Sequence, residues 1–216
     1  MKTLEEIRKI REEKREELDL RVNLKANTKE KHILVCKGTG CISSKAELII
    51  NNLRDYIKQN NIQNVKVVQT GCFGLCAKGP IVIVRPEDIF YAEVTPDDAE
   101  EIITSHIKEG KVVERLLCKD VDESTVNRLD ELTFYGKQKR IALQNCGIID
   151  PECIDEYIAF DGYKALEKVL LEMSQDEVIE EITKSQLRRQ RWSRVSSRQE
   201  MDVYKNGKRR SKICSV

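Results

Sequence analysis

The residues of this 216-residue chain best suited to chemistry are four cysteines arranged in two pairs. Cys36 and Cys41 are separated by four residues, and Cys72 and Cys76, thirty residues further along, are separated by three. Each pair lies in a glycine-bearing loop directly after a segment that is expected to be a strand. Thiolates are soft ligands, and four of them supplied by two loops are typical of a metal or iron–sulfur site.

Three kinds of site compete for these thiolates. A [2Fe–2S] cluster needs two thiolates on each iron, and glycines would let the backbone approach its sulfides closely. Structural zinc accepts similar spacings, although small zinc folds seldom contain so complete an α/β core. A redox dithiol normally uses C-x-x-C, a spacing that neither pair has. The pattern favours the cluster and leaves a zinc-stabilised interaction module as the alternative.

The segments around the two pairs predict a small α/β sandwich. Strands are expected at 32–35, 64–70, 81–84 and 89–94, and helices at 44–57 and 95–110, in the order β-α-β-β-β-α. Ser44 and Glu47 would form a capping box, so that the positive end of the first helix faces the cysteines. Both cysteine loops follow the C-terminal ends of strands, where α/β folds commonly carry their sites.

Further elements are expected on both sides of this sandwich. Thr3 and Glu6 can form a capping box that opens a charged helix over 3–22. Residues 119–139 are polar and are interpreted as a linker, and 139–143 as a short strand. Helices are then expected after 150 and after 162, and another beginning at a capping box of Ser174 and Glu177.

Charge is distributed unevenly along the chain. The net charge is +1, but residues 188–216 hold ten Lys and Arg against two Asp and Glu. The preceding 187 residues are therefore acidic, which argues against nucleic acid as the main partner. We expect no membrane insertion and no signal peptide, since no long apolar run is present. A cytoplasmic location is predicted, where thiols stay reduced and eight cysteines need not form disulfides.

Two motif sets in order resemble a known family. The paired cysteines on a compact α/β unit are similar to the thioredoxin-like [2Fe–2S] ferredoxins. The following segments, Asn145-Cys146-Gly147-Ile148-Ile149-Asp150-Pro151 and Gly162-Tyr163-Lys164-Ala165-Leu166, resemble the lead-in to a flavoprotein core. Together they resemble the NADH-binding subunit of NAD(P)-linked, often electron-bifurcating [FeFe] hydrogenases, a relative of the NADH-oxidising subunit of complex I.

The resemblance implies four segments: an N-terminal charged helix (1–28), a ferredoxin domain (29–118), a linker and incomplete lead-in of the core (119–187), and a basic tail (188–216). It implies electron transfer through a [2Fe–2S] cluster held by Cys36, Cys41, Cys72 and Cys76, with other hydrogenase or NADH dehydrogenase subunits as partners. FMN, NAD(P) and [4Fe–4S] clusters are expected only in a full-length family member. By itself this chain is not expected to oxidise NADH.

The remaining candidate ligands are assigned to packing. Cys118, Cys146 and Cys153 have no partner at ligand spacing and are expected to be small core residues. His106 lies beside the apolar stripe of its helix and is expected at the edge of the core. A Rieske-type role for His32 would need a second histidine ligand.

The tail departs from the family pattern. After Leu187-Arg188 the family continues Gly-Arg-Gly-Gly-Ala-Gly-Phe-Pro, a segment that helps to hold the flavin phosphate, whereas this chain continues Arg189-Gln190-Arg191-Trp192-Ser193-Arg194-Val195-Ser196. Suitable codons for the observed residues, displaced by one nucleotide, encode the glycine-rich version. The hypothesis is that 189–216 is an out-of-frame tail that truncates the family protein; a basic binding arm and a disordered terminus are the alternatives.

The frameshift hypothesis predicts the DNA around codon 188. Reading the genomic sequence one nucleotide later should give Gly-Arg-Gly-Gly-Ala-Gly-Phe-Pro followed by a long open frame. Resequencing the locus checks this, and a displaced frame without the glycine-rich segment would contradict the hypothesis.

Overall fold

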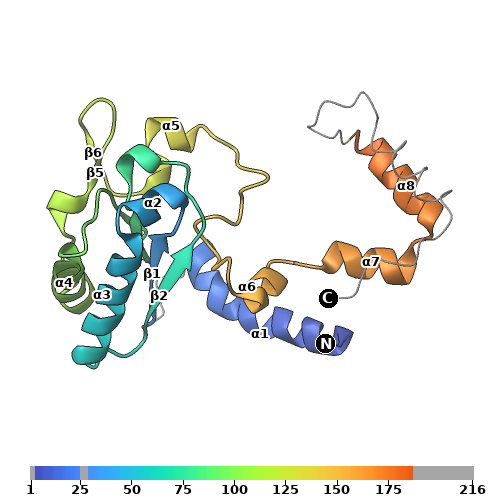
Figure 1. The fold of residues 1–216 in the computed structure, drawn as a ribbon, viewed down its shortest axis with the longest axis horizontal. Coiled ribbons are helices and arrows are strands. Elements are labelled where there is room, and N and C mark those ends of the chain that lie inside the picture. Colours follow the sequence, from blue (N-terminus) through green and yellow to red (C-terminus); the bar gives the residue numbers. More distant parts are fainter. Residues whose placement is uncertain (1–2, 25–28, 187–216) are drawn as a thin grey trace. The chain divides into compact units, whose positions relative to one another are not determined.

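The computed structural model describes residues 3–24 and 29–186 and divides the chain into two compact units, Met1–Asp161 and Gly162–Val216. Figure 1 shows the elements in chain order. The expected tail at 188–216 lies outside the described residues. The predicted domain limits stay predictions.

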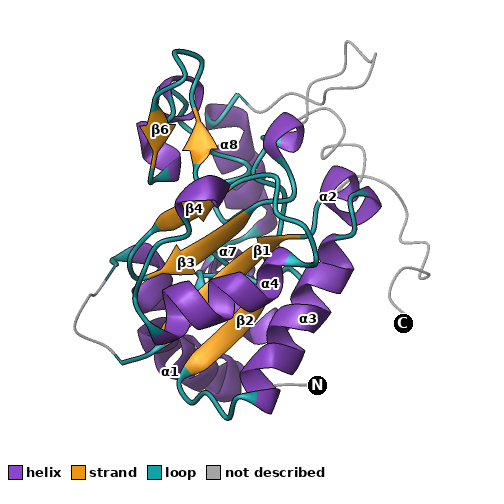
Figure 2. Cartoon of the chain, turned by 90° about the vertical axis from the view of Figure 1, so that its left-hand side faces the viewer, coloured by secondary structure: helices purple, strands orange, loops and turns teal. Residues whose placement is uncertain are grey.

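A four-stranded mixed sheet forms the centre of the first unit (Figure 2), in the order β2-β1-β3-β4. Its strands are β1 (Lys31–Cys36), β2 (Val65–Thr70), β3 (Val82–Arg85) and β4 (Ile89–Tyr91). β1 pairs in parallel with β2, and the pairs β1–β3 and β3–β4 are antiparallel. The expected hairpin of the third and fourth strands is therefore confirmed.

The parallel pair fixes where the two cysteine loops begin. Cys36, the last residue of β1, lies opposite Thr70, the last residue of β2. Between the two strands the chain forms α2 (Thr39–Ser43) and α3 (Ala46–Gln59), because a parallel connection requires a crossover. Both loops therefore leave the sheet at the same edge.

The core has two parts, one on each face of the sheet. Because side chains alternate along a strand, Ile33 and Val35 pack with one cluster and Leu34 and Cys36 with the other. The first cluster includes the buried face of α3, which the helical spacing of Ile49 and Leu53 predicts. Figure 2 shows α3 and α4 (Asp98–Glu101) over this face.

Helix starts differ from expectation at two of the four predicted caps. Capping boxes open α1 (Leu4–Val22) at Thr3 and α8 (Gln175–Lys184) at Ser174, as predicted. The box at Ser44 and Glu47 is wrong, because α2 begins earlier, at Thr39, and Lys45 in the left-handed region (φ 68°) separates it from α3.

The helix expected at 95–110 starts without a side-chain cap. α4 begins at Asp98 and continues as a π-helix over Ile102–Lys108. The Asp98 carboxylate accepts hydrogen bonds from the backbone and the hydroxyl of Thr95 at 2.7 and 2.8 Å. Thr95 therefore donates to Asp98 and does not itself cap the helix.

The interpretation of 119–139 as a linker is wrong. This segment contributes β5 (Cys118–Lys119), β6 (Thr125–Val126), a 3-10 turn (Leu129–Glu131) and α5 (Thr133–Gly136). Val126, Leu129 and Leu132 are buried in the second cluster, although charged neighbours surround them in the sequence. The backbone N–H of Phe90 donates to Asn127 at 2.7 Å, which ties the segment to β4.

The strand expected at 139–143 is also wrong. These residues form turns, and no strand of the described chain pairs with them. Ile141 and Leu143 stay exposed, so their apolar pattern alone does not make a strand without a partner edge.

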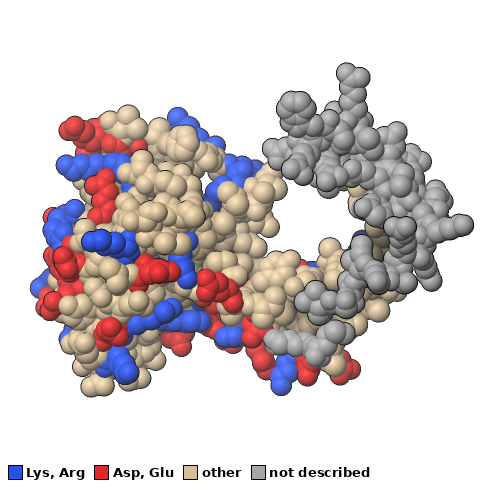
Figure 3. Space-filling model, viewed as in Figure 1, with Lys and Arg blue, Asp and Glu red and all other residues tan. Residues whose placement is uncertain are grey.

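The last elements are α6 (Ile154–Ala159) in the first unit, and α7 (Lys164–Glu172) and α8 in the second. Positive and negative side chains are interspersed on the described face of the first unit in Figure 3. Among the helices of the described residues, none combines the length and the apolar composition needed to cross a membrane.

A buried histidine supports the first core cluster: His106 is fully buried, deeper than the expected position at the edge of the core. Its Nδ1 atom lies 2.8 Å from the hydroxyl of Tyr91, which also accepts the backbone N–H of Val113. The hydroxyl has its own proton left to donate, so Nδ1 is the acceptor of a neutral imidazole. Burial lowers the pKa of His106 to about 4, with Lys31 adding to this effect and Glu87 opposing it.

This histidine predicts a loss of stability in acid. Between pH 6.5 and 4 the imidazole of His106 is protonated in the unfolded chain but stays neutral in the folded chain. The free energy of unfolding therefore falls as the pH drops. The loss should be about 1–2 kcal/mol between pH 7 and 5. His106→Asn, which keeps an acceptor near Nδ1, should show a shallower pH dependence in urea unfolding. Equal slopes for the two proteins would contradict this assignment.

Candidate metal centre

The four cysteines lie at one edge of the sheet and differ in their exposure to solvent. Cys36 ends β1 and Cys41 lies within α2, and both are buried. Cys72 follows β2 by two residues and is half-buried. Cys76 begins a 3-10 turn (Cys76–Lys78) and is exposed. The site therefore has an inner pair and an outer pair of thiols.

Within each pair the thiols contact one another. Burial, a hydrogen bond with the Cys36 thiol and the thiolates of Cys36 and Cys72 raise the pKa of Cys41 to about 12. Repulsion by the Cys72 thiolate and a hydrogen bond with that thiol raise the pKa of Cys76, and Cys36 adds to the repulsion. The inner and outer pairs therefore lie close enough to influence each other's charge.

Glycines of the first loop face cysteines of the second. The position that a Cβ of Gly38 would occupy lies 3.0 Å from Cβ of Cys72, and that of Gly40 lies 3.7 Å from Sγ of Cys76. In the opposite direction, a Cβ at Gly79 would lie 2.8 Å from Sγ of Cys41. The structure thus brings all four predicted ligands together across two facing loops.

A backbone N–H group also donates a hydrogen bond to the outer pair of thiols. The N–H of Gly74 donates to Sγ of Cys72 at 3.3 Å, and Gly74 adopts φ 85°, which favours glycine. Such a donor stabilises negative charge on a sulfur ligand.

The thiols form two pairs, and this arrangement distinguishes the two metal hypotheses. Structural zinc requires four ligands around a single centre, whereas a [2Fe–2S] cluster requires two thiolates on each of two irons. The donor set and its glycine-lined space fit the binuclear cluster, and the zinc alternative gains no support.

Among the other candidate ligands, Cys118 belongs to the second core cluster, which also contains Cys36 and Cys41. Cys118 and His106 are buried, in agreement with their assignment to packing, and His32 is buried as well. Cys153 is half-buried. Cys214 lies outside the described residues.

One contact near the site was missed by the sequence analysis. Sγ of Cys146 lies 3.0 Å from the Cβ position of Gly71, directly before Cys72. Its neighbour Gly147 adopts φ 86°, and the Phe73 ring fills the place of a Cβ there. A glycine after Asn145-Cys146 was a signal of close backbone approach, but the sequence did not show what it approaches.

The facing loops predict different outcomes for two glycine substitutions. Gly79→Ala pushes a methyl group against Sγ of Cys41, whereas Gly40→Ala meets Sγ of Cys76 at an ordinary contact distance within a helix. Gly79 has φ −79°, so the substitution tests space and not backbone strain. Gly79→Ala should lower the free energy of unfolding by about 1–3 kcal/mol, and Gly40→Ala should not. Urea unfolding of the metal-free chains measures this, and equal stabilities would contradict the packing.

Comparison with known proteins agrees with this geometry. The family described as thioredoxin-like [2Fe-2S] ferredoxin matches residues 22–106. A 2Fe-2S ferredoxin of Clostridium pasteurianum is 43% identical over 94 residues, which cover 39% of this chain and 92% of the relative.

A hydrogenase subunit and a solved structure also match. The NADP-reducing hydrogenase subunit HndC of Solidesulfovibrio fructosivorans is 56% identical over 56 residues, 26% of this chain and 11% of the subunit. The thioredoxin-like [2Fe-2S] ferredoxin of Aquifex aeolicus is 28% identical, with a TM-score of 0.38 over 41% of this chain and 90% of that structure. From the match to nearly the whole clostridial ferredoxin, and from the four thiols at one sheet edge, the chain belongs to the thioredoxin-like [2Fe–2S] ferredoxins.

Proposed function

We propose that Cys36, Cys41, Cys72 and Cys76 bind one [2Fe–2S] cluster and that the chain is a one-electron carrier within a larger redox enzyme. The observation that carries this proposal is the arrangement of two thiol pairs on facing loops at the edge shared by β1 and β2. When bound, such a cluster accepts and releases single electrons.

The four thiols and the Gly74 N–H have different roles in this proposal. The inner pair, Cys36 and Cys41, is buried in the core, and this burial keeps water away from the inner side of the site. The outer pair ends at the exposed Cys76, which gives a redox partner its shortest approach. The Gly74 N–H stabilises charge on the Cys72 sulfur and so favours the reduced state.

The larger enzyme is a hydrogenase or a complex-I-like NADH dehydrogenase in this proposal. Its support is the match to the hydrogenase subunit HndC, which is much longer than the matched segment. The described side chains of α7 and α8 are not buried, although both helices are amphipathic. Exposed Leu166, Leu170 and Leu171 suit a lead-in that packs on a flavoprotein core. FMN, NAD(P) and [4Fe–4S] clusters would belong to that core.

Colour and metal content test the ligand set. The anaerobically purified chain should be red-brown, with visible absorption bleached by dithionite and about two irons per chain. Cys72→Ser should abolish or shift this spectrum, because serine offers a harder ligand. Cys118→Ser is the matched control, since Cys118 is also buried but its thiol lies 3.5 Å from the Lys119 carbonyl, and the spectrum of this variant should be unchanged.

Two results would overturn the assignment. A colourless protein with about one zinc per chain would favour the zinc-stabilised interaction module. An unchanged spectrum in Cys72→Ser would remove that residue from the ligand set.

A further inference from the structure

A segment far outside the family match lies against the second cysteine loop. The N–H of Gly147 donates to the Thr70 hydroxyl at 2.9 Å, and this hydroxyl donates to the carbonyl of Ile149 at 3.0 Å. Thr70 is fully buried and ends β2, two residues before Cys72. A single side chain thus joins the start of the cysteine loop to residues 146–150, which follow the family match by some forty residues.

The same segment packs against both neighbours of Cys72. Sγ of Cys146 lies 3.0 Å from the Cβ position of Gly71, and the Phe73 ring comes within 2.3 Å of the Cβ position of Gly147. At 147 only glycine permits this approach, and at 71 a Cβ would press closely against the sulfur. The loop around Cys72 is therefore covered on the side that faces residues 146–150.

A buried ion pair fixes this segment to the N-terminal helix. The Arg21 guanidinium of α1 donates to both carboxylate oxygens of Glu156 at 2.7 and 3.0 Å, and to the carbonyl of Ile148 at 2.9 Å. The Glu156 carboxylate also accepts the N–H of Asp150 at 2.7 Å. Arg21 and Glu156 are only 1% and 2% exposed. Bidentate pairs of this kind are geometrically restrictive, so the segment has one fixed position.

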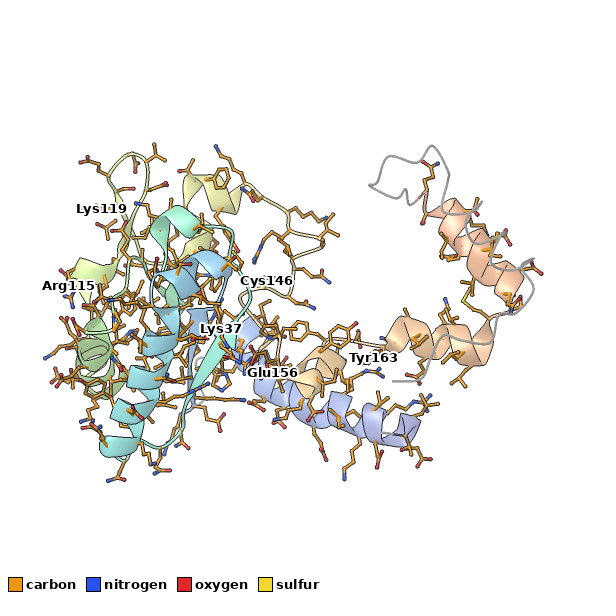
Figure 4. All side chains as sticks on the ribbon, in the orientation of Figure 1. Lys37, Arg115, Lys119, Cys146, Glu156 and Tyr163 are labelled. Atoms are coloured by element: carbon orange, nitrogen blue, oxygen red, sulfur yellow. The ribbon has the colours of Figure 1, made fainter. Side chains whose placement is uncertain are left out.

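Polar contacts close the outer edge next to Cys36. Nζ of Lys37 lies 3.0 Å from Oε1 of Gln69 and 3.0 Å from Oε1 of Glu152, and Gln69 donates to Glu152 at 2.8 Å. Figure 4 shows Lys37, Cys146 and Glu156 around the end of β2. These contacts link Lys37 and Gln69, at the ends of β1 and β2, to Glu152 at the surface.

We propose that residues 146–150 form a fixed wall of the cluster site and that Thr70 is the positioning residue that holds the wall against the Cys72 loop. The inference rests on the proposed cluster at the four cysteines. Reduction adds negative charge, which water stabilises better than protein does. By excluding water, the wall lowers the reduction potential and leaves the Cys76 edge for electron exchange.

The test uses the full chain, purified anaerobically, with Thr70→Val and Thr70→Ser. Valine keeps the shape of threonine but removes the hydroxyl that bridges Gly147 and Ile149, whereas serine keeps it. In Thr70→Val, amide exchange at 146–150 should become at least several-fold faster, and the midpoint potential should shift to more positive values. Thr70→Ser should restore both towards the wild type.

Two further variants make the result specific. Arg115→Gln breaks an ion pair with Asp98 on an element away from the wall, and it should change neither readout. Cys146→Ala removes the sulfur against Gly71 without removing a backbone hydrogen bond. It should shift the potential in the same direction, and it serves if Thr70→Val does not fold.

The outcomes separate this inference from the proposed function. A chain without a cluster would refute the proposed function, while the amide exchange of the metal-free chain would still report on Thr70. Unchanged exchange in Thr70→Val would refute the positioning role. Faster exchange with an unchanged potential, or no shift in Cys146→Ala, would refute the wall.

Discussion

The parallel pairing of β1 with β2 is the constraint on which the site depends. Because Cys36 and Thr70 are opposite partners, the two cysteine loops begin side by side. A shift of one residue would exchange Leu34 and Val35 between the two core clusters and would move Cys36 away from its position opposite Thr70. β1 is buried on both faces, and its register with β2 sets the position of the thiols as well as the packing.

At the site itself, close packing and charge repulsion are both unfavourable. Thiolates this close repel one another, and burial of the inner pair adds a desolvation cost. The glycines at 38, 40 and 79 supply the space that facing sulfurs need. The fold concentrates these costs in a small region and offsets them with two well-packed core clusters on either side of the sheet.

Much of the core could be predicted from the sequence because its signals are local. The helical stripe of α3, the β-branched runs of the strands and the cysteine spacing each indicate their structure within a few residues. The interpretation of the segment after Cys118 as a linker was wrong because Val126, Leu129 and Leu132 pack against residues elsewhere in the chain. The prediction of a helix cap at Ser44 was wrong because α2 begins earlier, at Thr39, than the capping pattern indicates.

The surroundings of Cys146 could not be predicted for a different reason. Its position follows from the contacts of Thr70 with Gly147 and Ile149, which lie 77 and 79 positions later in the chain. It also follows from the pairing of Arg21 with Glu156, 135 positions later. No periodicity or spacing rule reaches across such distances. The bidentate geometry of Arg21 and Glu156 becomes visible only when the whole unit is assembled.

That long separation has a consequence for the order of biosynthesis. The ribosome releases all four thiols by residue 76, but the carboxylate that secures the covering segment arrives 80 residues later. A nascent chain therefore contains all four cysteines for several seconds of translation before the covering segment is made. Binding of the proposed cluster at that stage would precede the pairing of Glu156 with Arg21.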